Sequence, residues 1–198
     1  MRYIQHRVNL ASNLKLVPNN FGVEIDLRSS HGEIILSHDP NSEGELFQDW
    51  LESYEHDILV LNVKEDGLES IILNLLTKNN IKEYFFLDQP FPTLLKSLRS
   101  KMKVAVRVSE FERVNWAFDE NPEWLWLDSF SGDWDYLKEM IPERNPSDIK
   151  RCLVSPELHG RDPFTEIPKI LNSLRRLQIM PEAVCTKHID LWKKSING

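Results

Sequence analysis

The chain has 198 residues, of which 41% are hydrophobic and 28% are charged, as expected for one globular domain with a substantial buried core. The formal net charge of −7 argues against a general nucleic-acid binder and against charge-driven binding to anionic membranes, although a local basic pocket could still hold a phosphate. No apolar run is long enough to span a membrane, and the N-terminal residues lack the apolar core of a signal peptide. We therefore expect a cytoplasmic protein with a single domain over residues 1–198 and a small-molecule partner; the sequence does not indicate its oligomeric state.

Strand-like apolar runs and helix-like amphipathic segments alternate along most of the chain. The eight predicted strands are 3–7, 22–28, 58–64, 84–88, 104–108, 124–128, 151–155 and 183–187. The predicted helices are 43–54, 68–78, 92–101, one from Ser109 with Glu112 as its capping box, 134–141, 164–177 and 189–196. Segment 9–20 contains Pro18 and several asparagines, which favours a loop or one distorted helical turn. The pattern indicates an α/β protein.

The second predicted strand has a charged face. Glu24, Asp26 and Arg28 alternate with apolar residues, so a strand places these three side chains on one side. A return run over 33–36 can pair back as a hairpin and ends next to His38. Two carboxylates two residues apart with a nearby imidazole suit a divalent cation and a proton-transfer group.

Eight strands separated by helices favour a compact (β/α)8 TIM barrel with a reduced first helix, and an open doubly wound sheet is the alternative. In such a barrel the active site lies at the carboxyl ends of the strands. Polar residues gather at those ends in this sequence: His6, Arg7, Glu24, Asp26, Arg28, Asn62, Lys64, Asp88, Arg107, Asp128, Ser155, Glu157, Lys187 and His188. We therefore expect a polar site. Cys152 and Cys185 lie in short apolar runs and are expected to be reduced core residues.

Four motifs follow one another over residues 6 to 64: His6-Arg7, Glu24-x-Asp26, His38-Asp39 and Asn62-x-Lys64. Their order resembles that of the glycerophosphodiester phosphodiesterases, in the superfamily of phosphatidylinositol-specific phospholipase C-like phosphodiesterases. The run His6-Arg7-Val8-Asn9 is also similar to the His-x-Val-Asn of the sphingomyelinase D-like branch. The resemblance implies a divergent member with a TIM barrel of the PLC-like phosphodiesterase type.

The resemblance also implies a reaction, the cleavage of a soluble polar diester such as a glycerophosphodiester or sugar phosphodiester. It implies these roles: general base and acid for His6 and His38; phosphate binding for Arg7 and Lys64; and one Mg²⁺ or Ca²⁺ held by Glu24, Asp26 and Asn62. The nucleophile is either water or a neighbouring hydroxyl of the substrate. The family has an acidic residue at the position of Asn62, so the metal is held weakly, Asp88 or the substrate helps to hold it, or the chain is a degenerate relative.

Two further cations are candidates from their position at strand ends. Arg107 either binds phosphate or forms an ion pair with Asp88 or Asp128, and Lys187 has the same two interpretations. Two other functions are open. A non-catalytic barrel could bind a phosphorylated ligand or a protein partner, and an aldolase-type enzyme could form a Schiff base at Lys64 or Lys187.

Overall fold

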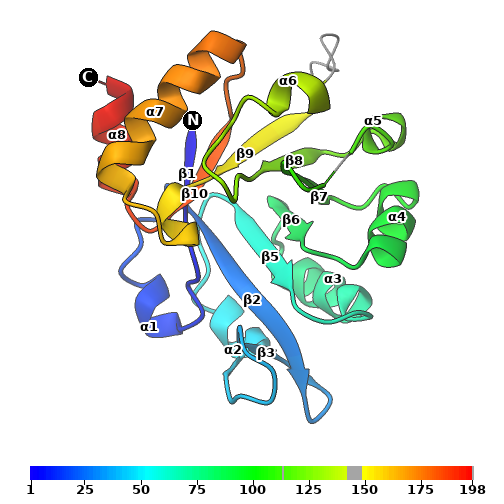
Figure 1. Cartoon of the computed structure of the whole chain (residues 1–198). Coiled ribbons are helices and arrows are strands. Elements are labelled where there is room, and N and C mark those ends of the chain that lie inside the picture. Colours follow the sequence, from blue (N-terminus) through cyan, green and yellow to red (C-terminus); the bar gives the residue numbers. More distant parts are fainter. Residues whose placement is uncertain (113, 142–148, 198) are drawn as a thin grey trace. The chain divides into compact units, whose positions relative to one another are not determined.

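The computed structural model describes residues 1–112, 114–141 and 149–197. It has a mixed α/β fold of ten strands, most of them separated by helices, in agreement with the predicted α/β class (Figure 1). The contacts divide the chain into two compact units, an N-terminal unit of residues 5–104 and a C-terminal unit of residues 1–4 and 105–198. Closure of the strands into a barrel and a single domain stay predictions.

The N-terminal unit contains a sheet in the order β4-β3-β2-β5-β6. Its strands are β2 (Gly22–Ser30), β3 (Glu33–Leu36), β4 (Glu45–Leu46), β5 (Leu59–Val63) and β6 (Tyr84–Leu87). Its helices are α1 (Ala11–Leu14), α2 (Phe47–Leu51), α3 (Glu69–Lys78) and α4 (Phe91–Arg99). The strands β2, β5 and β6 are parallel to one another. Every residue of β5 is buried, as its continuous apolar run predicts.

The predicted hairpin is present and is longer than expected. Strand β2 extends to Ser30, pairs antiparallel with β3, and connects to it through His31 and Gly32 (Figure 1). Both connecting residues have positive φ, at 52° and 86°. This backbone belongs to the two-residue turn whose twist matches that of the flanking strands. The hairpin carries the segment containing His38 back toward the carboxyl half of β2, where Ser37 N–H donates to Asp26 O over 3.0 Å.

The C-terminal unit contains strands in the order β1-β10-β9-β8-β7. These are β1 (Arg2–Gln5), β7 (Ala105–Val108), β8 (Trp124–Leu127), β9 (Lys150–Val154) and β10 (Ala183–Thr186). The helices are α5 (Ala117–Glu120), α6 (Leu137–Met140), α7 (Pro163–Leu177), α8 (Ile189–Asn197) and the 3-10 turn η1 (Pro156–His159). Helices α7 and α8 pack together (Figure 1). Cys152 and Cys185 are reduced and buried, as predicted.

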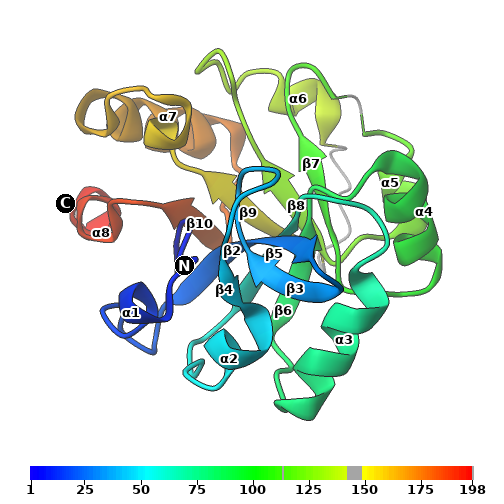
Figure 2. The same cartoon turned by 90° about the horizontal axis from the view of Figure 1, so that it is seen from below.

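Two predicted helices are wrong in extent. In place of a helix over 43–54, the chain forms the short strand β4 and then α2, which packs against β3 and β4 (Figure 2). The cause is Gly44, where a Cβ atom would lie 2.3 Å from the backbone oxygen of Leu36, so this segment lies directly against β3. The helix expected from Ser109 is also absent at that point, because Ser109 and Glu112 form an isolated antiparallel bridge and α5 begins at Ala117.

The other elements agree with the predictions to within a few residues, although α6 covers only the end of the helix predicted over 134–141. No helix among residues 1–112, 114–141 and 149–197 has the length and apolar character needed to cross a membrane.

Candidate functional site

The centre of the candidate site is Asp26, a carboxylate that is only 1% exposed. Lys64 Nζ lies 3.1 Å from its Oδ1, and Arg7 Nε lies 3.3 Å from its Oδ2. Lys64 comes directly after β5, and the pairing of Asp26 with Asn62 in the parallel register brings this strand end beside β2. The side chains of Lys64 and Arg7 keep 18% and 44% of their surface exposed. Two cations reachable from solvent are therefore held by one buried carboxylate.

Arg7 contributes through its backbone as well as its side chain. Its φ of 55° is in the left-handed region, which costs a non-glycine residue roughly 1 kcal/mol. In this conformation Arg7 N–H donates to Glu24 Oε2 over 2.7 Å while the side chain reaches Asp26. An unfavourable backbone conformation that serves two contacts is a recurrent feature of functional sites.

Asn9 belongs to the site although we did not predict a role for it. Its Nδ2 donates to Asp26 Oδ2 over 2.9 Å, and its Oδ1 accepts from the backbone N–H of Asp26, also over 2.9 Å. These two bonds fix the segment after β1 on the middle of β2. The His-x-Val-Asn run was the signal that pointed to this residue.

Glu24 lies two residues before Asp26 on the same face of β2 and is also 1% exposed. Asn62 Nδ2 donates to its Oε1 over 3.0 Å, and His6 Nε2 lies 3.7 Å from its Oε2. The pKa of Glu24 is raised from its ordinary value of 4.5 to about 7, first by burial and then by the negative charge of Asp26, against the opposing effects of Asn62, the Arg7 N–H and Lys64. Glu24 can therefore hold or release a proton near neutral pH.

A divalent cation fits this arrangement poorly. Mg²⁺ and Ca²⁺ need six or more oxygen ligands, but the oxygens of Asp26 are engaged by Lys64, Arg7 and Asn9. The oxygens of Glu24 accept from an amide and a backbone N–H. Asn62 Oδ1 is the buried oxygen of this set without a hydrogen-bond partner in the described part of the chain. No group of three or more His, Cys, Asp or Glu residues suited to a metal occurs there either.

His38 lies at the same end of β2 and is linked to Lys64 through Arg28. The guanidinium of Arg28 donates from Nε to the backbone oxygen of His38 over 3.1 Å and from Nη1 to that of Lys64 over 3.3 Å. His38 Nδ1 is 2.8 Å from Asp39 Oδ1, and this hydrogen bond lowers the pKa of Asp39, with smaller contributions from the charges of His38, Arg7 and Arg28. The His38 side chain is 43% exposed. The N-terminal unit thus brings together His6, Arg7, Glu24, Asp26, Asn62 and Lys64, with His38 on an adjoining exposed segment.

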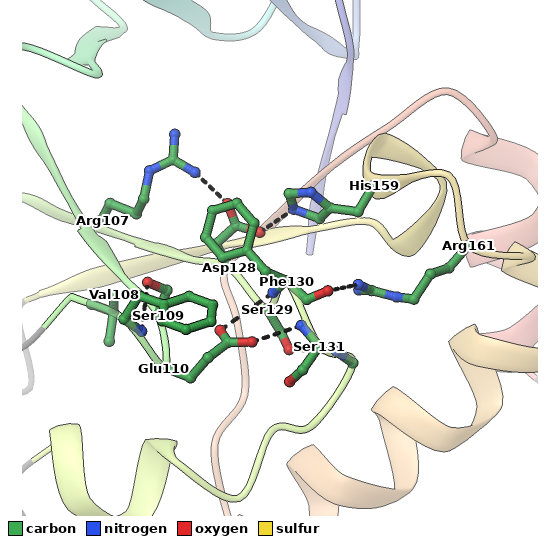
Figure 3. Close-up of polar contacts among 12 residues, drawn as sticks. Arg107, Val108, Ser109, Glu110, Asp128, Ser129, Phe130, Ser131, His159 and Arg161 are labelled. Atoms are coloured by element: carbon green, nitrogen blue, oxygen red, sulfur yellow. Dashed lines mark hydrogen bonds and ion pairs between the residues drawn. The ribbon is translucent and has the colours of Figure 1, made fainter.

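Arg107 belongs to a second polar cluster, in the C-terminal unit (Figure 3). Its Nη1 donates to Asp128 Oδ2, and His159 Nε2 lies 2.5 Å from Asp128 Oδ1. The ion pair between Arg107 and Asp128 is one of the two interpretations that the sequence leaves open. The ring of His159 also contacts that of Phe130, with centroids 4.8 Å apart. Phosphate binding by Arg107 stays a prediction.

The Lys187 side chain is exposed at the end of β10, and its backbone N–H donates to Glu157 Oε1 over 2.8 Å. Burial would raise the pKa of Glu157, but hydrogen bonds from the Ser155 and Thr186 hydroxyls and from this N–H lower it below its ordinary value. The observed role of this segment is therefore to fix the half-buried carboxylate of Glu157 between the ends of β9 and β10. A role for Lys187 in phosphate binding stays a prediction.

Solved structures of similar fold include two glycerophosphodiester phosphodiesterases. The enzyme from Agrobacterium tumefaciens str. C58 matches with a TM-score of 0.64 and 10% identity over 100% of both chains. A glycerophosphoryl diester phosphodiesterase from Parabacteroides distasonis matches with a TM-score of 0.62 and 11% identity over 99% of this chain and 86% of that one. Phosphoribosyl anthranilate isomerase from Thermus thermophilus matches with a TM-score of 0.54 and 14% identity, covering 94% and 86% of the two chains.

No protein-family model matches the sequence, and no curated protein matches it. At 10 to 14% identity the structural similarity shows a shared fold. The mixed α/β fold is thus shared with solved glycerophosphodiester phosphodiesterases, the family that the sequence motifs resemble, while closure into a barrel stays a prediction.

Proposed function

We propose that the protein cleaves a soluble polar phosphodiester, such as a glycerophosphodiester or a sugar phosphodiester, at the cluster around Asp26. The observation that carries the proposal is the pair of cations, Arg7 and Lys64, held 3.3 and 3.1 Å from one buried carboxylate with His6 beside them on Glu24. The names of two solved structures of this fold, both glycerophosphodiester phosphodiesterases, support the same reaction class.

Arg7 and Lys64 bind the non-bridging oxygens of the phosphodiester in this proposal. A phosphodiester is an anion that resists attack, and attack at phosphorus becomes easier when its charge is neutralised by preorganised donors. Asp26 holds both cations in place, and Asn9 in turn fixes Asp26. The phosphate would therefore enter a site whose donors are already oriented.

His6 and His38 move the protons. One imidazole takes a proton from the attacking hydroxyl while a P–O bond forms, and the other gives a proton to the leaving alcohol as the second P–O bond breaks. Glu24, with a pKa near 7, lies beside His6 and can stabilise its protonated form. The hydrogen bond that His38 Nδ1–H donates to Asp39 Oδ1 fixes the imidazole ring, which leaves Nε2 to act. The attacking hydroxyl belongs to water or to the substrate.

A metal ion has no step in this mechanism. The resemblance predicts Mg²⁺ or Ca²⁺ at Glu24, Asp26 and Asn62, but Arg7 and Lys64 already place two positive charges against Asp26. We therefore assign charge neutralisation to these two side chains.

The test measures release of alcohol from a glycerophosphodiester by the wild-type chain and by His6→Ala and His38→Ala. General acid–base catalysis typically contributes 10²- to 10⁴-fold, so each variant should lose at least about a hundredfold in kcat. His188→Ala, which removes an exposed histidine of the C-terminal unit, is the matched control and should keep full activity. Full activity of both test variants would show that the histidines have been assigned wrongly.

Binding without turnover would favour the alternative of a non-catalytic phosphate-binding protein. This alternative predicts that the wild-type chain binds inorganic phosphate saturably and cleaves no diester. It also predicts that Lys64→Met loses the phosphate binding.

A further inference from the structure

A recess adjoins the candidate site within the N-terminal unit. It has a volume of about 460 Å³ and lies between the end of the β2–β3 hairpin and the segment that follows His38. The residues of its wall that matter here are Arg28, Ser30, His31, Asn41, Ser42 and Glu43, and we call this recess the hairpin pocket. Its volume falls in the range of about 300 to 1,000 Å³ that is usual for small-molecule sites.

Arg28 lies between the hairpin pocket and the candidate site around Asp26, and it contacts both. It is the third residue of the charged face of β2, two positions after Asp26. It lines the pocket while donating to the backbone oxygens of Lys64 and His38. A substrate whose phosphate lies on Lys64 would therefore have the group attached to that phosphate close to the pocket.

The hairpin pocket offers hydrogen-bonding groups that the protein does not use. The side chains of Ser30, His31, Asn41 and Glu43 form no hydrogen bond or ion pair with other side chains or backbone in the described part of the chain. Hydroxyl, imidazole, amide and carboxylate groups together both donate and accept. Such a mixture matches a ligand that carries several hydroxyl groups, because each hydroxyl also donates and accepts.

The charges of the hairpin pocket argue against other ligands. Its cation, Arg28, has Glu65 3.9 Å away, and Glu43 adds a second carboxylate, so a second phosphate would meet no surplus of positive charge. A quaternary ammonium group is usually bound by several aromatic rings. Among the residues of the wall, the imidazole of His31 is the one aromatic ring.

We propose that the hairpin pocket binds a neutral polyhydroxylated alcohol, and that this alcohol is one of the two groups esterified to the phosphate of the substrate. The second half of the proposal rests on the proposed function. Arg28 then positions the alcohol relative to the phosphate, and the pocket selects sugar or polyol esters over choline-type esters.

The experiment compares two diesters with the wild-type chain and the double variant Ser30→Ala/Glu43→Ala. Glycerophosphoinositol carries a polyol, and bis(4-nitrophenyl) phosphate carries none. Loss of two hydrogen-bonding groups should lower kcat/KM for glycerophosphoinositol by roughly tenfold or more and leave that for the nitrophenyl diester unchanged. Ser70→Ala/Glu52→Ala, at two exposed positions outside the pocket, is the control and should change neither value. An equal loss on both substrates, or no loss on either, would overturn the pocket assignment.

Direct binding separates this inference from the proposed function. Saturable binding of free myo-inositol, observed by ligand-detected NMR and weakened in the double variant, is expected even if no diester is cleaved. If the wild-type chain cleaves no diester, the proposed phosphodiesterase function is refuted and the polyol pocket is not. Absence of myo-inositol binding to the wild-type chain, or equal binding to both proteins, would refute the polyol pocket.

Discussion

Asn62 donates a hydrogen bond from its side-chain nitrogen to Glu24 Oε1 over 3.0 Å, while its own side-chain oxygen has no partner among the described residues. The resemblance to glycerophosphodiester phosphodiesterases places an acidic residue at this position. A carboxylate here would face the buried Glu24 with a like charge, whereas the amide supplies a proton donor. The substitution therefore suits a site in which Glu24 and Asp26 are neutralised by protein groups.

Asn62→Asp is predicted to destabilise the protein when a chelator is present. The change removes the donor to Glu24 and adds a second buried carboxylate beside it, at a cost of about 1–3 kcal/mol in the free energy of unfolding. Denaturant unfolding at pH 8 in EDTA measures the loss. Millimolar Ca²⁺ should then restore stability to Asn62→Asp and not to Asn62→Ala, because only the former gains a carboxylate ligand. An Asn62→Asp protein as stable as the wild type in EDTA would contradict the prediction.

The ionisation of Glu24 predicts a pH dependence of stability in metal-free buffer. Its pKa is about 7 in the folded protein and about 4.5 as the ordinary value, so between these values the folded state binds more protons than the unfolded state. The free energy of unfolding therefore decreases as pH rises from about 4.5 to about 7, with each unit of pKa difference worth ~1.4 kcal/mol. It should not change further, through this group, above pH 8.

The variant Glu24→Gln tests that assignment, because glutamine does not titrate. We expect the decrease in stability between pH 4.5 and 7 to be smaller in Glu24→Gln than in the wild type, measured by urea unfolding in EDTA. Glu52→Gln, at an exposed position, should follow the wild-type profile. Parallel profiles for the wild type and Glu24→Gln would refute the raised pKa.

The strand pattern of β2 allowed a correct prediction of where Glu24 and Asp26 lie, because alternation in a strand fixes which side chains share a face. The residues that contact these two carboxylates were harder to predict from the sequence. Asn9 binds Asp26 from an irregular segment, and no periodic pattern constrains the position of a loop residue. Whether Arg107 would meet Asp88 or Asp128 was likewise undetermined until the pairing of β7 with β8 was known.

The prediction of a helix over 43–54 was wrong for a related reason. The spacing of Leu46, Phe47, Trp50 and Leu51 is helical, but Gly44 allows the preceding backbone to lie against Leu36 of β3, and this strand contact shortens the helix. Close approach of two backbones depends on tertiary structure, which a local pattern does not report. The capping box predicted at Ser109 is likewise absent, because the Ser109 hydroxyl donates to the Glu112 carboxylate over 2.9 Å and not to a backbone group, and α5 begins only at Ala117.

Phosphate binding is predicted to persist after metal removal. Because Lys64 and Arg7 supply the positive charge, the dissociation constant for inorganic phosphate should be the same with and without EDTA. Lys64→Met should weaken binding by roughly tenfold or more, since it removes a charge-assisted hydrogen bond. Lys78→Met, at an exposed lysine on α3, is the control and should bind as the wild type does. Loss of phosphate binding in EDTA, with recovery on adding Mg²⁺ or Ca²⁺, would show that a metal holds the phosphate.

The cluster around Asp128 is predicted to contribute to stability as a coupled set. Asp128 is 1% exposed and joins Arg107 to His159, so Asp128→Ala leaves both partners without their buried acceptor (Figure 3). Removing one member of a buried pair costs about 3–5 kcal/mol. The Arg107 and His159 side chains are 23% and 21% exposed, and water can partly replace the carboxylate, so we expect a loss of about 2 kcal/mol in the free energy of unfolding.

A double-mutant cycle separates this coupling from the loss of packing. Arg107→Met keeps much of the side-chain volume and removes the charge, so the double variant Asp128→Ala/Arg107→Met lacks both members of the ion pair. Its loss of stability should be smaller than the sum of the two single losses by about 1 kcal/mol or more, because residues in direct contact are not additive. Urea unfolding at pH 7 measures all four proteins. Additive losses would mean that the ion pair contributes nothing to folding, and would favour the interpretation in which Arg107 serves a ligand.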